Sequence, residues 1–402
     1  MLLKVLLKGD KAENSFDYFL GMVMVSVFFL PQSQLISVRL IFFTFIFSLF
    51  IKKNVAKGFE RSFDVFIFLS VLILGLTYTR ELTFGLRVLE TSFSLIAIPL
   101  ILFKIKNYNK AKLYQIFYAF TIGVVFASII CLADAVMSYI RLRDIHVFFY
   151  DRFTDVINSH PTYLAYYVIA SITFGLYLLY YEDLRFSKRW IVVVLVFLFL
   201  VLMLTGGLTA YISMLLVFSY FVLKFLLEDK TPRHTLTFVV VFCMILFMFL
   251  FHYLQDNFLN KRVDDYWERF ILWESALKAT SNILFGVGTG DYKFVLNQYY
   301  LTHNLSQFAD KSFNAHNQFI QTFFANGLIG LIALIIMLIR PIYLSVRNQN
   351  ILGILILFPF LIYGMTEVFL GRYQGVVFFA LMHQAFIQLY ANQPSPFALK
   401  ES

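Results

Sequence analysis

The sequence predicts an all-α polytopic membrane protein, and three observations support this fold class. Of the 402 residues, 60% are hydrophobic and only 14% are charged, whereas a soluble domain carries roughly 25% charged residues. Long apolar runs with few charges recur along the chain, and lysines and arginines gather in every second connection between them. So few polar residues could not cover the surface of a soluble protein, and lipid is therefore the expected solvent.

Apolar runs of about 20 residues can cross the roughly 30 Å of bilayer hydrocarbon. Runs of this kind predict about twelve transmembrane helices, at approximately 16–31, 35–51, 63–79, 84–103, 114–140, 162–181, 190–204, 208–227, 235–254, 318–339, 351–368 and 373–391. Thr205-Gly206-Gly207 is expected to divide residues 190–227 into a tight hairpin, because a single span there would be too long. The first run has no small-residue cleavage site and is expected to remain as a helix.

The positions of basic residues predict the topology. With the amino terminus in the cytoplasm, every inner connection carries lysine or arginine, as the connections around Lys52, Lys104, Arg185, Lys230 and Arg340 show. Both termini are then cytoplasmic. We expect residues 1–402 to form a single membrane domain, with a large outer loop at 255–317 between helices 9 and 10. The net charge of +9 follows mostly from these basic inner connections. It therefore does not indicate nucleic acid as a partner.

Charges inside predicted spans are costly and usually functional. They gather in the outer third of the predicted bundle, and nothing comparable lies in its inner half; the residues are Arg39, Arg80, Arg87, Glu90, Asp134, Glu367 and Arg372. We expect a polar cavity that opens outward and suits an anionic ligand, because guanidinium binds phosphate through a planar fork of donors. Two alternatives stay open: Arg87 pairs with Glu90 at i, i+3, or the arginines reach lipid headgroups.

The outer loop contains a predicted amphipathic helix over about 264–281, where Trp267, Phe270, Ile271 and Leu277 share one apolar face. This helix either lies at the membrane surface or presents Arg269 to the cavity. A glycine-rich run follows, Phe285-Gly286-Val287-Gly288-Thr289-Gly290-Asp291. Because no βαβ unit precedes it, a tight turn with close backbone approach is expected rather than a nucleotide site.

His316 stands at the predicted start of span 10, on the outer side. An imidazole at a helix N-terminus favours its neutral form and can act as a general base; the alternative is a structural histidine bonded to the loop. The sequence holds no HExxH, DxD or clustered Cys and His, so we expect no metal and no cofactor. Cys131 and Cys243 lie within apolar runs and are expected to be buried core residues.

Taken in order, these segments resemble the O-antigen ligase and polymerase family of bacterial membrane glycosyltransferases. The resemblance rests on Arg269…Trp273, Phe285-Gly286-Val287-Gly288-Thr289-Gly290, Ala315-His316-Asn317…Asn326-Gly327-Leu328-Ile329-Gly330, Thr366-Glu367…Arg372…Gly375-Val376-Val377-Phe378-Phe379, and Ser159-His160-Pro161-Thr162-Tyr163. It covers about the last third of the chain, and the remainder agrees with the family in topology.

The resemblance implies a multi-pass glycosyltransferase of the bacterial inner membrane. Such an enzyme moves a glycan from undecaprenyl diphosphate to a hydroxyl of a glycan, lipid or protein acceptor at the periplasmic face, with no metal and with inversion of configuration. The resemblance implies that His316 is the catalytic base and that Arg269 binds the diphosphate. The family often carries a Ser-Arg pair where this chain has Thr205-Gly206-Gly207. Either the donor site differs, or another arginine replaces that one; the candidate donor-site residues are Arg80, Arg87 and Arg372, with Glu367 beside them.

Three alternatives stay open. A repeat-unit polymerase of the same family is not separated from a ligase by the sequence. A polysaccharide-related transporter is a second possibility, although transporters often show internal repeats and midplane charges that are not evident here. A structural membrane protein without chemistry is the third.

Overall fold

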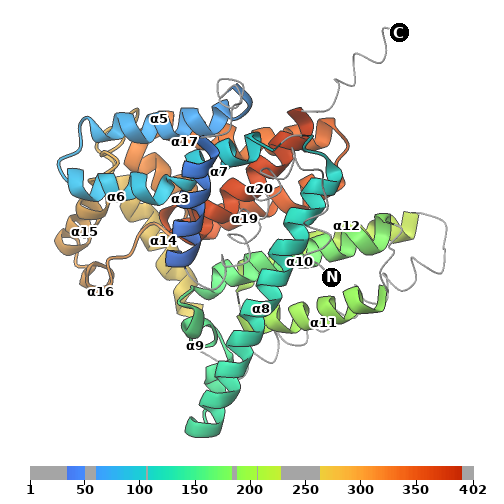
Figure 1. The fold of residues 1–402 in the computed structure, drawn as a ribbon. Helices are drawn as coiled ribbons and strands as arrows, with labels where there is room; N and C mark the ends of the chain where they lie inside the picture. The colour runs from blue at the N-terminus through green and yellow to red at the C-terminus, as the bar shows by residue number, and fades with distance from the viewer. Residues whose placement is uncertain are drawn as a thin grey trace, which may run out of the picture. The chain divides into compact units, whose positions relative to one another are not determined.

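A computed structural model describes residues 34–49, 60–105, 107–182, 188–205, 207–227 and 263–391 of the chain. In these ranges every regular element is a helix and no strand occurs (Figure 1), which confirms the all-α class. The chain divides into two compact units. The first comprises Met1–Leu40 and Lys110–Asn260, and the second comprises Ile41–Asn109 and Lys261–Ser402. Helix α3 (Gln34–Leu49) crosses the boundary between them.

Five helices among the described residues are long and apolar enough to cross a membrane: Leu82–Phe103, Lys110–Leu142, Pro161–Tyr181, Lys188–Thr205 and Gln318–Arg347. Three shorter apolar helices lie at Phe63–Leu76, Thr209–Phe225 and Ile351–Thr366. Together they support a multi-pass membrane protein. The total of about twelve spans stays a prediction, because the predicted spans 16–31 and 235–254 and both termini lie outside the described residues.

The first unit is built around one buried helix. Its elements are α8 (Lys110–Leu142), η1 (Ile145–Phe148), α9 (Asp151–Thr154), η2 (Asp155–Ile157), α10 (Pro161–Tyr181), α11 (Lys188–Thr205) and α12 (Leu208–Leu227). Helix α10 is buried along almost its whole length and packs against α8, α11 and α12. Helix α11 ends at Thr205 and α12 begins at Leu208, which confirms the predicted break. Cys131 is buried in α8 as predicted, and Cys243 is outside the described residues.

The second unit contains the remaining helices: α5 (Phe63–Leu76), α6 (Leu82–Ser92), α7 (Ser94–Phe103), α14 (Val263–Lys278), α15 (Tyr292–Thr302), α16 (Ser306–Asp310), α17 (Gln318–Arg347), α18 (Ile351–Leu357), α19 (Pro359–Thr366), η3 (Phe369–Gly371) and α20 (Tyr373–Ala391). Helix α5 packs along α17, and α7 packs along α20. Helices α5 and α17 run antiparallel: Asp64, near the start of α5, bonds Arg340, and the side chain of Asn326 lies beside Gly75 at the other end of α5.

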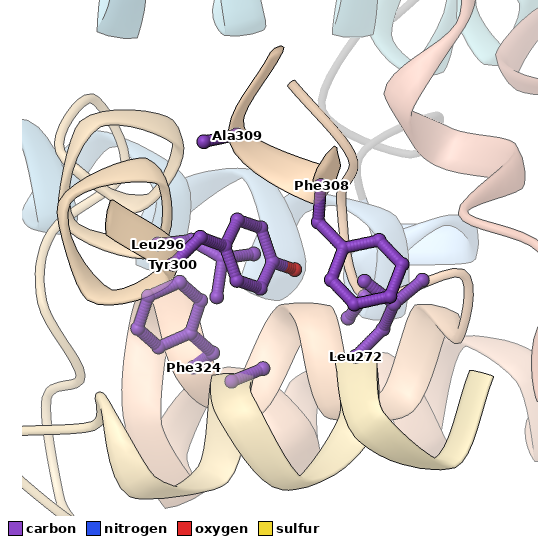
Figure 2. Close-up of a cluster of buried hydrophobic side chains, with 8 residues drawn as sticks. Leu272, Leu296, Tyr300, Phe308, Ala309 and Phe324 are labelled. Carbon is purple, nitrogen blue, oxygen red and sulfur yellow. The ribbon is translucent and has the colours of Figure 1, made fainter. Parts of the chain in front are cut away.

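The outer loop has a small hydrophobic core of its own. Helices α14, α15 and α16 meet the first turns of α17 around Leu272, Leu296, Tyr300, Phe308 and Phe324 (Figure 2), all of them buried. Helix α14 confirms the predicted loop helix. The residues predicted as its apolar face point away from this core, however: Trp267 is 67% exposed and Phe270 is 56% exposed.

The expectation that the inner half of the bundle holds no comparable charges is wrong for the second unit. Asp64 and His383 are fully buried, and the Asp64 carboxylate accepts hydrogen bonds from Arg340 Nη1 at 2.7 Å and His383 Nε2 at 2.8 Å. Arg340, predicted in an inner connection, lies inside α17 instead. Asp64 supplies this guanidinium with a buried counter-charge, which offsets the cost of the charge.

Candidate functional site

His316 lies just before α17. Its backbone has a φ of 43°, and its N–H donates to Asn314 Oδ1 at 2.8 Å. The helix begins after Asn317, whose side chain accepts hydrogen bonds from the backbone N–H groups of Phe319 and Ile320 and satisfies two of the free donors of the first turn. The cap leaves His316 outside the helix, with its side chain 28% exposed. The ring of Phe313 meets the imidazole edge-on, with centroids 5.5 Å apart.

Glu367 faces this imidazole. Its Oε2 lies 3.6 Å from His316 Nδ1, and its Oε1 accepts a hydrogen bond from the N–H of Val368 at 3.1 Å. Glu367 is only 9% exposed and immediately follows α19. At this separation the carboxylate faces the ring nitrogen without a direct hydrogen bond to it.

Two contacts hold the segment around Glu367 against the start of α17, and a third ties it to α14. Asn317 Nδ2 donates to the carbonyl of Met365 at 3.1 Å, and the N–H of Leu370 donates to Gln318 Oε1 at 2.8 Å. Arg269 of α14 donates through Nη1 to the carbonyl of Thr366 at 3.2 Å. The structure therefore brings His316, Glu367 and Arg269 into one cluster. Asn317 and Gln318 directly follow His316 in the sequence, but their spacing does not indicate that they bind the segment around Glu367.

The other three candidate arginines are exposed on neighbouring elements of the second unit. Arg80 lies in the turn between α5 and α6, Arg87 on α6, and Arg372 between η3 and α20. Within the described residues, their side chains form no hydrogen bond or ion pair, so the alternative that Arg87 pairs with Glu90 is not supported. Arg39 and Asp134 belong to the first unit. Whether all these charges line one cavity stays a prediction.

The glycine-rich segment is not a phosphate cradle. Its amides from Gly286 to Asp291 donate in turn to Asn282 O, Phe324 O, Ala325 O, Gly75 O, Thr79 Oγ1 and Gly288 O, so none of them is left to bind an anion. The predicted close backbone approach is confirmed. Gly286 and Gly288 have φ values of 71° and 111°, and a Cβ on Gly286 would lie 2.5 Å from the carbonyl carbon of Ala325.

This segment also completes α17. The helix breaks at Gly327 (φ 64°, ψ −162°), which frees backbone groups on both sides of the break. The N–H groups of Val287 and Gly288 bond the carbonyls of Phe324 and Ala325, while the N–H groups of Leu328 and Ile329 bond the carbonyls of Ile283 and Leu284. Residues 283–291 therefore replace the missing helical hydrogen bonds, and we call this arrangement the glycine clasp.

Side chains extend the clasp to the turn between α5 and α6. Asn326 Nδ2 donates to Thr289 Oγ1 at 2.8 Å, and that hydroxyl donates to the carbonyl of Leu72 at 2.8 Å. The Asp291 carboxylate accepts from the backbone N–H groups of Arg80 at 2.9 Å and Glu81 at 2.8 Å. The clasp therefore fixes the turn that carries Arg80 to the helix that follows His316.

Replacing Gly327 by alanine is expected to destabilise the protein by about 2 kcal/mol or more. A backbone with φ 64° and ψ −162° is open essentially to glycine alone and costs another residue roughly 1–3 kcal/mol. The new Cβ would also lie 2.2 Å from the carbonyl carbon of Leu284. The measurement is thermal unfolding of the purified protein in detergent. Gly207→Ala is the matched control, because among the described residues a Cβ there meets only Ala210 Cβ at 3.6 Å. Equal melting temperatures for the two variants would show that the clasp has no such role.

The segment Ser159–Tyr163 has a structural role in the first unit. His160 caps α10, with its Nδ1 accepting from the N–H of Thr162 at 3.4 Å, and its Nε2 lies 3.8 Å from an oxygen of Asp151. Pro161 occupies the first helical position, where its missing N–H costs nothing. These contacts explain the start of α10 and assign no chemistry to His160.

Comparison with known proteins gives one family match. Residues 192–335 match the model of the family described as O-antigen ligase. This range contains Arg269, the glycine clasp segment, His316 and Gly327, and it ends before Glu367 and Arg372. An uncharacterized protein of Haemophilus influenzae is 28% identical over 138 residues, which cover 32% of this chain and 34% of that protein.

Proposed function

Because residues 192–335 carry an O-antigen ligase domain, we propose that this chain is a membrane glycosyltransferase of that family. In this proposal it moves a glycan from undecaprenyl diphosphate to an acceptor hydroxyl at the periplasmic face of the bacterial inner membrane, without a metal ion. The observation that carries the proposal is the cluster of His316, Glu367 and Arg269. It joins a base, a carboxylate that can orient it and a cation beside them.

The proposed base is His316 Nε2. With Glu367 facing Nδ1, the proton of a neutral imidazole is favoured on Nδ1, and the second nitrogen is left as the acceptor. The separation of 3.6 Å is longer than a hydrogen bond, and such contacts often shorten only when substrate binds. Glu367, first expected to bind substrate, is better explained as a positioning residue, because a carboxylate would repel a diphosphate.

The proposed reaction is a single displacement at the anomeric carbon. The acceptor oxygen attacks that carbon while its proton passes to His316, and the bond from the carbon to the diphosphate oxygen breaks. Undecaprenyl diphosphate leaves with the bonding electrons, and the configuration of the sugar inverts. With no covalent intermediate, catalysis depends on the base and on cations that stabilise the charge that develops on the leaving group.

We propose Arg269 as the cation nearest the reaction, because it is tied to the residue next to Glu367. Arg80, Arg87 and Arg372 are exposed, so their guanidinium groups are available to a ligand. In our proposal one or more of them takes the place of the arginine that is missing beside Thr205-Gly206-Gly207. Bidentate binding of phosphate by arginine gives such a site both affinity and orientation.

The proposed function is tested by the carrier-lipid profile of the native host with and without this gene. Deletion is expected to cause accumulation of a glycan linked to undecaprenyl diphosphate, because its consumer is missing, and the wild-type gene should reverse this. Full-length stalled chains would identify a ligase, and single repeat units would identify a polymerase. Unchanged carrier-linked glycans, with an exported polysaccharide missing instead, would contradict the proposal and favour a transporter.

A further inference from the structure

Helix α17 carries a long exposed apolar stripe. Its members recur every three or four residues, and they are Leu328, Ile329, Ile332, Ile335, Ile336, Ile339, Tyr343 and Val346, each at least 37% exposed. From Leu328 to Val346 the stripe is about 27 Å long at 1.5 Å per residue. This length is close to the roughly 30 Å of bilayer hydrocarbon. This length and composition suit a face of α17 that lipid covers, and Leu328 is the end of the stripe nearer the predicted outer side.

The glycine clasp holds part of the outer loop at this same level. Leu328 N–H donates to the carbonyl of Ile283 at 2.8 Å, and Ile329 N–H donates to that of Leu284 at 3.4 Å. The side chains of Ile283, Leu284 and Phe285 are 69%, 52% and 40% exposed. Three consecutive exposed apolar residues thus lie beside the outer end of the lipid-facing stripe.

The backbone of this segment suits a lipid environment. The N–H groups of Leu284 and Phe285 both donate to Asn282 Oδ1, at 2.9 and 3.1 Å. The carbonyl of Leu284 accepts from Ile329, and that of Phe285 accepts from the hydroxyl of Tyr78 at 2.5 Å. Irregular backbone is tolerated at membrane depth only when its polar groups are satisfied by protein, and here the groups of Leu284 and Phe285 are satisfied.

Helix α14 extends the apolar surface. Trp267, Phe270 and Leu277 are 67%, 56% and 48% exposed, while Leu272 and Ala276 on the opposite face are buried in the loop core. Exposed apolar residues this large and this closely spaced mark an interaction site rather than ordinary surface. Tryptophan and phenylalanine on one face of a helix are typical of helices that lie in the membrane interface.

We infer that Ile283–Phe285 and the exposed face of α14 form a lipid-contact surface inserted among the outer-leaflet acyl chains. The continuity of residues 283–285 with the lipid-facing stripe of α17 favours acyl chains over a protein partner. The outer loop is then not wholly periplasmic, because it returns to membrane depth at the clasp. This surface stands independently of the proposed catalytic activity.

The test uses purified full-length protein, one copy per lipid nanodisc, in a Cys131→Ala, Cys243→Ala background. Leu284→Cys is compared with Gln307→Cys, an exposed position on α16, for reaction with a membrane-impermeant maleimide. The thiol introduced at position 284 is expected to react at least about tenfold more slowly than the thiol at position 307, because a thiol in hydrocarbon does not form the reactive thiolate. Both variants should react equally after denaturation in detergent.

Trp267 provides an independent readout. In a Trp190→Phe, Trp273→Phe variant, its fluorescence is expected to fall in nanodiscs made with lipid brominated in the upper acyl chain, relative to unbrominated lipid. Rapid labelling of the Leu284→Cys variant together with unquenched Trp267 would overturn the inference and leave this face to a protein partner or a second copy. Slow labelling with unquenched Trp267 would overturn it for α14.

Discussion

Alanine in place of His316 is expected to slow glycan transfer by about 10²–10⁴-fold, the usual contribution of a general base. Purified wild type and variant would be assayed on carrier-linked glycan extracted from the deletion host, with that host's membranes as acceptor. His303→Ala is the matched control: this outer-loop histidine stacks on Tyr299 with centroids 3.9 Å apart and has no contact with Glu367 in the described residues. Normal turnover by the His316 variant would refute its assignment as the base.

Glu367→Gln provides a second variant for the same prediction. If Glu367 only orients the imidazole, kcat should fall by less than for His316→Ala while KM for the donor stays unchanged, because the interaction lost acts on the base and not on the bound glycan. A raised KM with unchanged kcat would instead support the first expectation, that Glu367 binds substrate.

Asp64→Ala is expected to destabilise the protein by about 3–5 kcal/mol, because removal of one partner leaves the other charge buried and uncompensated. Asp64 and His383 are fully buried, and both His383 and Arg340 donate to the Asp64 carboxylate. The measurement is thermal unfolding in detergent. Glu274→Ala is the control: it removes an exposed i, i+4 partner of Lys278, and exposed pairs contribute little.

A triple replacement separates charge compensation from packing. The triple variant Asp64→Leu, Arg340→Leu, His383→Leu should recover much of the stability lost in Asp64→Ala. Replacing a buried ionic group by apolar residues of similar size often leaves the free energy of unfolding unchanged. A melting temperature for Asp64→Ala equal to that of wild type would mean that these charges are not coupled.

The positions of the helices could be predicted because membrane helices leave a direct trace in the sequence. Their apolar length must match the bilayer, so predicted spans such as 162–181 and 190–204 agree closely with α10 and α11. The break at Thr205 and the close approach of the glycines followed from the conformational freedom of glycine. The apolar face of α14 was also visible, but composition alone did not show which face would meet the protein core.

Contacts between distant segments could not be predicted in the same way. Glu367 lies far from His316 in the sequence, and their proximity depends on side-chain bonds from Asn317, Gln318 and Arg269. The positive-inside pattern assigns Arg340 to an inner connection, but this pattern does not indicate that the residue has a buried partner. The partners of Asp64 come from two other helices, α17 and α20, so its sequence neighbours do not indicate them. Similarly, i, i+3 spacing permits an Arg87–Glu90 pair, but spacing alone does not form one.

The most direct test of the central claim is the amount of undecaprenyl-diphosphate-linked glycan in the deletion host complemented with each protein at equal expression. The account predicts that wild type and His303→Ala clear the accumulated donor, whereas His316→Ala leaves it as high as in the deletion. If His316→Ala cleared the donor as wild type does, transfer would not depend on this histidine, and the proposed mechanism would be wrong.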